Sequence, residues 1–239
     1  MIKAVLLDWF TTLSKFEPSR EKLYCNAFAE LGIVVPEDKA ARGVLLGDEY
    51  LYTENMKTPL AQLPAEVRDE MYLCFPRMIA EEAKIKVAPH IHQEVREKIR
   101  KSFGGATYVL FDDVIPTVKS LREKGLNLGL VTNLREDIKR ESINALCRRL
   151  GLEPYLKFAI TSEQVGFAKP DRRIFQAALE KAGVKADEAI FVGDQYRIDV
   201  VGARNAGIQP ILIDRYNLYP DVTDCPRIRT LPEVEKYLR

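Results

Sequence analysis

The sequence has 239 residues, of which 46% are hydrophobic and 30% charged, and its 36 basic and 35 acidic residues give a formal net charge of +1. This composition is typical of a globular protein with a substantial core, and the near-zero charge argues against nucleic acid or a membrane surface as a partner. No apolar stretch reaches the ~18 residues that a membrane span requires.

The cysteines are scattered along the chain without a CxxC pair, at Cys25, Cys74, Cys147 and Cys225. This pattern favours buried thiols in a reducing cytoplasm over a disulfide framework or a zinc site. Met1 leads directly into the first predicted strand, which leaves no room for a signal peptide. We therefore expect a cytoplasmic protein.

The first predicted strand, residues 2–7, is an apolar run that leads into Asp8. A short apolar run with a polar break at its end is typical of a strand buried on both faces. Asp8 would then lie at the carboxyl end of the strand, where open α/β sheets bind ligands. Taken alone, a strand-end or helix-capping role explains Asp8 better than a role as nucleophile or metal ligand.

Residues 18–103 show helical periodicity and almost no strand signal. We predict four helices there, beginning at residues 20, 36, 64 and 89. The apolar face of the third predicted helix carries Val67, Met71, Tyr72 and Phe75. The block reads as a helical insert over residues 15–103, which divides the rest of the chain into residues 1–14 and 104–239.

From Tyr108 onward, predicted strands alternate with predicted helices. The strands are residues 126–132, 158–161, 189–193 and 208–213, and the helices are residues 113–124, 136–150, 171–182, 198–205 and a last one from residue 232. This alternation is typical of right-handed βαβ crossovers and a parallel sheet, so we expect an α/β fold.

Polar side chains follow several of these strands. Thr132 and Asn133 end one strand, and Asp194 follows another. The carboxyl ends of parallel strands share one edge of a sheet, so these groups are expected near Asp8. The loop before the helix at 171 carries Lys169 and could reach the same edge.

Such a group of side chains suits a phosphorylated or otherwise anionic substrate together with a hard cation. Asp8 and Asp194 supply the oxygen ligands that Mg²⁺ prefers. Lys169 would help to keep Asp8 ionised and therefore nucleophilic. Thr132 would donate a hydrogen bond to the group being transferred.

Four ordered segments can be compared with known motifs. They are Asp8-Trp9-Phe10-Thr11-Thr12-Leu13, Val131-Thr132-Asn133, Gly166-Phe167-Ala168-Lys169-Pro170-Asp171, and Val192-Gly193-Asp194-Gln195-Tyr196-Arg197-Ile198-Asp199. In this order they resemble the motifs of the haloacid dehalogenase-like (HAD) hydrolase superfamily, and the resemblance covers about the whole chain.

The resemblance implies a Rossmann-like parallel sheet core with an inserted α-helical cap, a Mg²⁺ cofactor and an aspartyl-enzyme intermediate on Asp8. It also implies that Asp194 binds the metal, that Asp199 is a direct or indirect partner of the metal, and that the backbone carbonyl of Phe10 is another ligand. Thr132 and Lys169 would act on the phosphoryl oxygens. The expected contacts to a small anionic substrate are Trp9, Phe10, Thr12 and Asn133, although Phe10 can equally be a packing residue.

Phe10 departs from the family pattern, in which phosphatases usually carry a second Asp two residues after the nucleophile. That Asp protonates the leaving oxygen and later activates water, and general acid–base catalysis of this kind contributes about 10²–10⁴-fold. Phe10 can do neither. We therefore expect a preference for phosphorylated metabolites with good leaving groups.

Two branches of the family also lack this Asp. The 2-haloacid dehalogenases have Tyr there, work without Mg²⁺ and bind the substrate carboxylate with a cap arginine, for which Lys39 and Arg42 lie in the right area. The phosphonate hydrolases begin with Asp-Trp and need a cap lysine, for which Lys57 is a candidate. Gly193-Asp194 in the fourth motif favours a metal and therefore a phosphatase. A third alternative is a HAD-fold protein with little turnover that binds a ligand or partner.

Overall fold

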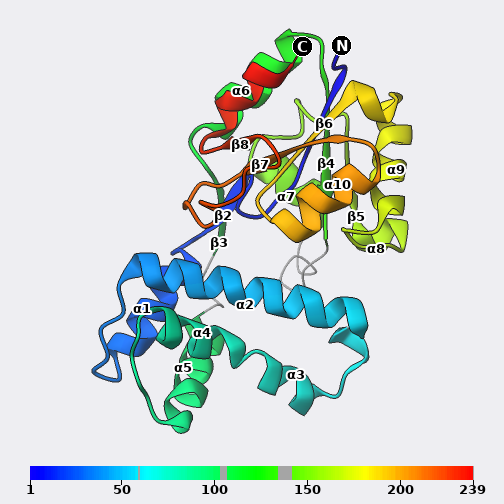
Figure 1. The fold of residues 1–239 in the computed structure, drawn as a ribbon. Helices are drawn as coiled ribbons and strands as arrows, with labels where there is room; N and C mark the ends of the chain where they lie inside the picture. Colours follow the sequence, from blue (N-terminus) through cyan, green and yellow to red (C-terminus); the bar gives the residue numbers. More distant parts are fainter. Residues whose placement is uncertain (59, 103–106, 134–141, 239) are drawn as a thin grey trace. The chain divides into compact units, whose positions relative to one another are not determined.

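The computed structural model describes residues 1–58, 60–102, 107–133 and 142–238 (Figure 1). The chain divides into two compact units. Met1–Lys15 and Val109–Arg239 form one, which we call the sheet unit, and Phe16–Tyr108 form the other, the helical unit. No helix in the described part of the chain is long and apolar enough to cross a membrane.

The sheet unit is built on a six-stranded sheet in the order β5-β4-β1-β6-β7-β8. All neighbouring strands are parallel. The strands are β1 (Ala4–Leu7), β4 (Asn127–Thr132), β5 (Phe158–Thr161), β6 (Ala189–Gly193), β7 (Gln209–Ile213) and β8 (Arg227–Ile228). Leu7 at the end of β1 lies opposite Leu130 in β4 and Val192 in β6, so β1 ends between two strands at the same edge. This arrangement confirms the predicted α/β fold with a Rossmann-like parallel sheet.

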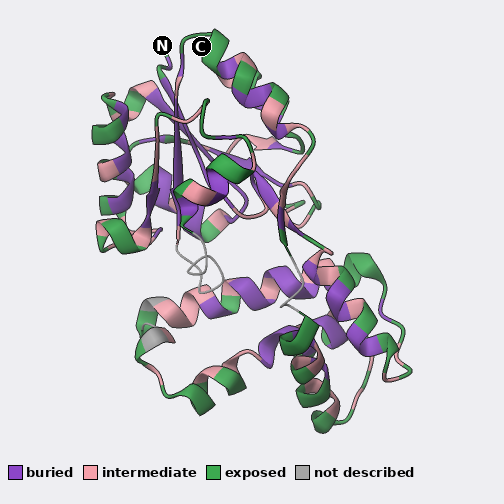
Figure 2. Ribbon diagram, turned by 180° about the vertical axis from the view of Figure 1, so that it is seen from behind, coloured by how far each residue is buried: buried purple, intermediate pink, exposed green. Residues whose placement is uncertain are grey.

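Helices accompany this sheet. They are α6 (Val114–Glu123), α7 (Ile143–Arg149), α8 (Ser162–Val165), α9 (Arg172–Ala182) and α10 (Val201–Asn205), with a π-helical turn η5 (Tyr196–Val200) and 3₁₀ turns η4 (Ala186–Glu188) and η6 (Leu231–Tyr237). Figure 2 shows buried strands in the middle of this unit and exposed outer faces on the helices. Both faces of the central strands are therefore covered, as parallel sheets require.

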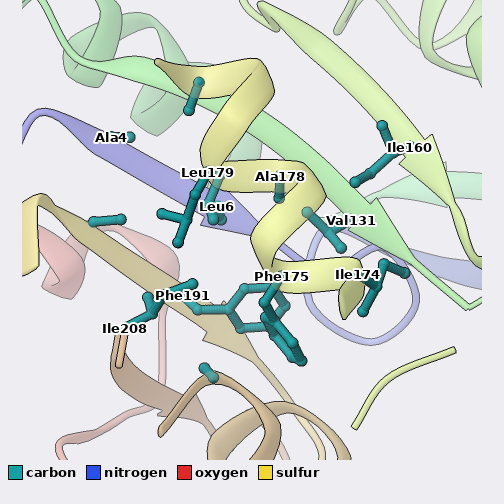
Figure 3. Close-up of a cluster of buried hydrophobic side chains, with 13 residues drawn as sticks. Ala4, Leu6, Val131, Ile160, Ile174, Phe175, Ala178, Leu179, Phe191 and Ile208 are labelled. Atoms are coloured by element: carbon teal, nitrogen blue, oxygen red, sulfur yellow. The ribbon is translucent and has the colours of Figure 1, made fainter. Parts of the chain in front are cut away.

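The core on one face of the sheet is shown in Figure 3. Ile174, Phe175 and Ala178 of α9 pack there against Leu6 and Phe191 of the strands. The rings of Phe175 and Phe191 meet edge to face, with their centroids 5.0 Å apart. Such aromatic pairs contribute about 0.5–1.5 kcal/mol beyond burial. This packing fixes α9, and with it the loop that precedes α9, against the sheet.

The helical unit consists of α1 (Arg20–Ala29), α2 (Glu37–Lys57), η1 (Leu60–Gln62), α3 (Ala65–Met71), α4 (Cys74–Glu82) and α5 (Pro89–Ser102). Its α2 and α4 approach closely at two glycines. A Cβ on Gly43 would lie 2.5 Å from the Cα of Ile79, and one on Gly47 would lie 2.3 Å from the Phe75 ring. Buried Leu23, Phe28 and Ile79 are among the residues that complete this core.

A buried ion pair links α1 to α2 within the helical unit. Arg20 donates to both carboxylate oxygens of Asp48, at 2.7 and 3.0 Å. The Arg20 guanidinium also lies 5.1 Å from the centroid of the Phe75 ring. The two opposite charges cancel, and each nitrogen of the guanidinium that donates binds a different oxygen of the carboxylate.

The structure differs from the predictions in the helical region. The third predicted helix is in fact two, because α3 ends at Met71 and α4 begins at Cys74, so Phe75 does not share a helical face with Val67. Val67 is 45% exposed. Local periodicity missed this break because Tyr72 and Leu73 keep helical backbone angles through it.

Three short strands were also missed. They are β2 (Ser14–Glu17) and β3 (Thr107–Leu110), which pair in a two-stranded sheet, and β8 (Arg227–Ile228) at the edge of the main sheet. β2 and β8 contain few apolar residues and therefore give little strand signal. The chain passes from one unit to the other within β2 and β3, because the units divide after Lys15 and after Tyr108.

Further details emerge in the sheet unit. The last predicted helix is present as the 3₁₀ helix η6, the helix predicted over residues 198–205 begins as the π-helical turn η5, and α8 was not predicted. The helix predicted over residues 136–150 falls partly outside the described residues. Its described part, α7, begins at Ile143 after Ser142, whose hydroxyl accepts a hydrogen bond from the Ala145 N–H.

Candidate functional site

Asp8 lies immediately after β1, and Asp194 immediately after the neighbouring strand β6. The backbone N–H of Asp8 donates to the carbonyl of Val192 at 2.9 Å, which extends the ladder between these strands by one residue. Both side chains are buried, with 7% of Asp8 and 9% of Asp194 exposed. The parallel register therefore places two carboxylates side by side at the carboxyl edge, as the sequence predicted.

Lys169 is the cation among these carboxylates. Its ammonium donates to Oδ1 of Asp8 and, at 2.7 Å, to Oδ1 of Asp199. Lys169 is only 3% exposed and Asp199 only 2%. A lysine so deeply buried requires charged partners, and these contacts supply them.

Lys169 is held in place through its own backbone. The side-chain amide of Asn133 accepts from the Lys169 N–H at 2.7 Å and donates to the Lys169 carbonyl at 3.0 Å. The ring of Phe191 lies beneath the ammonium, with its centroid 5.3 Å from Nζ. The contacts of Asn133 favour a role in positioning Lys169 over the substrate contact predicted above.

Asp199 reaches the site from the π-helical turn η5. Its Oδ2 accepts from the Gln195 N–H at 3.0 Å. Gly193 makes room for it, because a Cβ at position 193 would lie 2.3 Å from the Asp199 Cγ. This steric role of Gly193 was not predicted, since it depends on how the π turn folds back over the strand end.

Burial dominates the electrostatics of Asp8. Its removal from water raises the pKa of Asp8 from 3.8 to about 6; the nearby ammonium of Lys169 works in the opposite direction, and the Asp199 carboxylate adds to the rise. Burial alone would lower the pKa of Lys169, but the Asp199 and Asp8 carboxylates outweigh it and the pKa is raised. Lys169 is therefore charged at neutral pH, and Asp8, with a pKa of about 6, is largely ionised there as well.

The donor set fits a divalent cation. One carboxylate oxygen from each of Asp8, Asp194 and Asp199 lies within 4.8 Å of the others. When ionised, these three carboxylates and the Lys169 ammonium sum to a charge of −2. Carboxylate oxygens are the ligands that Mg²⁺ takes, and a divalent ion would neutralise this charge.

The remaining predicted site residues differ in accessibility. Trp9 and Thr12 are fully buried, Thr132 is 3% exposed, and Phe10 is partly buried. The hydroxyl of Thr132 contacts the Asn133 carbonyl at 3.3 Å. The burial of Trp9 favours a packing role over a contact with substrate.

In the helical unit, the candidate residues for the alternative chemistries make ordinary surface pairs. Lys57, with a side chain 65% exposed, binds Glu54 at 2.6 Å, and Lys39 lies 3.6 Å from Asp38. Arg42 lies 3.7 Å from Glu82. An exposed lysine paired with Glu54 is typical of a surface residue, whereas a Schiff-base lysine lies in a desolvated pocket.

Comparison with known proteins identifies the family of the chain. The model of the haloacid dehalogenase-like hydrolase family matches residues 2–207. The chain is 36% identical over 219 residues to a glyceraldehyde 3-phosphate phosphatase of Methanothermobacter thermautotrophicus, covering 90% of this chain and 86% of the relative. Other curated relatives match over about half of the chain.

Solved structures share the fold. A HAD phosphatase from Thermococcus onnurineus is 25% identical with a TM-score of 0.56, covering 99% of this chain and 98% of the other. A 2-haloacid dehalogenase from Pseudomonas syringae is also 25% identical, with a TM-score of 0.55 and coverage of 100% and 98%. The chain is therefore a hydrolase that belongs to the haloacid dehalogenase-like family.

Proposed function

We propose that the protein is a Mg²⁺-dependent phosphatase of this family that acts on a small phosphorylated metabolite through Asp8 as nucleophile. The observation that carries this proposal is the buried cluster of Asp8, Asp194 and Asp199 around a single lysine. Its excess negative charge suits a divalent cation and, with it, a phosphate dianion. A relative over most of its length is named a glyceraldehyde 3-phosphate phosphatase, which supports the same class of reaction.

Asp8 attacks phosphorus in line, and the bond to the leaving oxygen breaks with its electron pair on that oxygen. The resulting aspartyl phosphate is then hydrolysed by water, which restores the Asp8 carboxylate. Splitting the reaction in this way replaces one difficult step with two easier ones. Lys169, held by Asn133 and Asp199, keeps positive charge beside Asp8 and binds a phosphoryl oxygen, and Thr132 donates to another.

Mg²⁺ would be held by Asp8, Asp194 and the carbonyl of Phe10, with Asp199 as a direct or indirect partner, and when bound it would offset the carboxylate charge and polarise the phosphoryl group. Asp199 already spans Lys169 and the Gln195 N–H, which fixes the orientation of its carboxylate. The orientation of Asp199 is thus fixed without a cation.

Phe10 sets the expected substrate preference. Its side chain cannot protonate a leaving oxygen, so phosphates whose leaving group departs unprotonated are favoured by up to about 10²–10⁴-fold. The test is to measure kcat/KM for p-nitrophenyl phosphate, acetyl phosphate, glycerol phosphate and glyceraldehyde 3-phosphate, with Mg²⁺ and with EDTA. Equal rates on activated and alkyl phosphates would refute the leaving-group argument, and full activity in EDTA would refute the metal.

A second candidate is halide release from a 2-haloacid. It is favoured by the aromatic residue at position 10 and by the likeness to a 2-haloacid dehalogenase. The three clustered carboxylates count against it, because that chemistry needs no metal. Chloride release from L-2-chloropropionate that persists in EDTA would establish it in place of the phosphatase. A binding protein with little turnover is the remaining alternative, and it fails if Asp8→Asn abolishes a robust activity.

A further inference from the structure

The backbone of the loop that follows Asp8 is strained at one residue. Thr11 has a φ of 63°, in the left-handed region that β-branched residues rarely adopt. Hydrogen bonds inside the loop hold this conformation: Thr11 N–H donates to the Ser14 carbonyl at 2.7 Å, and Leu13 and Ser14 N–H both donate to the Trp9 carbonyl at 2.9 Å. Strain of this kind persists only where the surroundings enforce it.

The side chain of Arg215 binds the loop from outside, at the residue that follows Thr11. Arg215 follows β7 by two residues and donates to the Thr12 carbonyl from Nε at 3.2 Å and from Nη2 at 2.9 Å. Its side chain is only 8% exposed. The contact joins residues 203 positions apart in sequence, so it is a tertiary restraint on the loop.

Arg215 is in turn fixed by two neighbours. Asp113, at the start of α6, accepts from Nη1 and Nη2, each at 2.9 Å. The ring of Phe111 lies 4.0 Å from the guanidinium carbon, and the Phe111 N–H donates to the Leu13 carbonyl at 3.1 Å. Asp113 also accepts from the Leu231 N–H at 2.8 Å, which ties the clamp to the C-terminal turn.

From this arrangement we infer that Arg215 is a positioning residue for the metal site: by clamping the Thr12 carbonyl, it holds the strained loop so that the carbonyl of Phe10 is oriented as a ligand. This inference rests on the proposed function, because it requires the cation to bind at Asp8 and Phe10. Arg suits the task because only its planar fork can bind the Thr12 carbonyl and a carboxylate together. Within the described residues, Arg215 binds the Thr12 carbonyl and Asp113 and none of the three clustered carboxylates.

The test is titration of the metal-free protein with MgCl₂ by isothermal calorimetry, which reads affinity without turnover. Arg215→Ala is expected to weaken Mg²⁺ binding by about 10- to 100-fold, the range typical of outer partners of metal sites. Arg215→Lys is expected to fall between this variant and the wild type, since lysine cannot serve both partners at once. Arg148→Ala is the matched control: it removes an arginine that binds Glu153 through two nitrogens in the same unit, and Mg²⁺ affinity should not change.

A rescue variant separates positioning from general stability. Glycine adopts positive φ without steric cost, so Thr11→Gly should restore part of the affinity that Arg215→Ala removes. Thermal unfolding of each metal-free variant is measured alongside. If Arg215→Ala lowers Tm but binds Mg²⁺ as tightly as the wild type, Arg215 is merely structural and the inference is overturned. If the wild type itself binds no Mg²⁺, the proposed metal site fails and the inference fails with it, a result that the wild-type titration alone identifies.

Discussion

Both units of the protein bury ionised side chains, but they do so in different ways. In the helical unit, Arg20 and Asp48 form one fork-shaped pair whose charges cancel. In the sheet unit, Lys169 faces several carboxylates, and the cluster keeps an excess of negative charge. The first arrangement is complete as it stands, whereas the second needs another cation. Burial of charge alone therefore does not mark a functional site; the imbalance of charge does.

Substitution of Asp8 is expected to have the largest effect, and it tests whether the charged cluster of the sheet unit serves function rather than stability. Asp8→Asn removes the nucleophile, and we expect phosphatase activity to fall by about 10⁴-fold or more. We expect no loss of stability at pH 7 in the absence of metal. Burial raises the pKa of Asp8 from 3.8 to about 6, so the stability of the metal-free wild type falls as the pH rises across this interval, and asparagine removes that effect.

Activity on p-nitrophenyl phosphate and urea unfolding at pH 7 measure the two effects separately. Glu153→Gln is a suitable control, because Glu153 pairs with Arg148 at the surface and lies outside the cluster. A variant that keeps its activity would exclude Asp8 as the nucleophile. A variant that lost activity only because it unfolded would remove the contrast between the two units.

Arg20→Ala should behave in the opposite way. It leaves the Asp48 carboxylate buried without its fork partner, and breaking a buried pair on one side costs about 3–5 kcal/mol of unfolding free energy. Mg²⁺ affinity of the folded protein should not change. Urea unfolding measures the cost, and the double variant Arg20→Met with Asp48→Leu should recover much of it, since a neutral apolar pair carries no unmatched charge. If the double variant were as unstable as the single one, packing rather than charge would explain the loss.

Mg²⁺ is expected to raise the free energy of unfolding only by binding to the negatively charged cluster of the sheet unit. A ligand that binds the folded state alone stabilises it by about 2.7 kcal/mol at 100 times its Kd. We expect Tm of the wild type to rise with MgCl₂ and to return to its starting value with EDTA. Asp194→Asn, which removes a carboxylate ligand, should abolish the shift, whereas Arg20→Ala should retain it from a lower starting Tm. A shift that survived in Asp194→Asn would place the ion elsewhere.

The two regions also differ in how far sequence predicted them. The strand ends carrying Asp8 and Asp194 were predictable, because buried parallel strands are continuous apolar runs and their carboxyl ends share an edge. Lys169 was predicted to reach that edge from a loop. The clamp by Arg215 and the support of Lys169 by Asn133 were not, since each joins distant segments through side chains that have no periodic pattern. The break between α3 and α4 was missed because nothing local separates it from a continuing helix.

One tightly packed glycine in each unit allows a test in which the expected effects are small. A Cβ on Gly193 would press on the Asp199 carboxylate at 2.3 Å, and one on Gly43 would press on the Ile79 backbone at 2.5 Å. Overpacking of this kind costs about 1–3 kcal/mol in either unit. We expect Gly193→Ala to weaken Mg²⁺ binding and activity as well, because the side chain that must move is Asp199. Gly43→Ala should lower only stability, since the contact is with backbone that holds α2 against α4.

Calorimetric Mg²⁺ titration and urea unfolding of both variants distinguish these outcomes. Unchanged Mg²⁺ affinity in Gly193→Ala would show that Asp199 can shift without disturbing the cation, which would exclude Asp199 as a metal ligand.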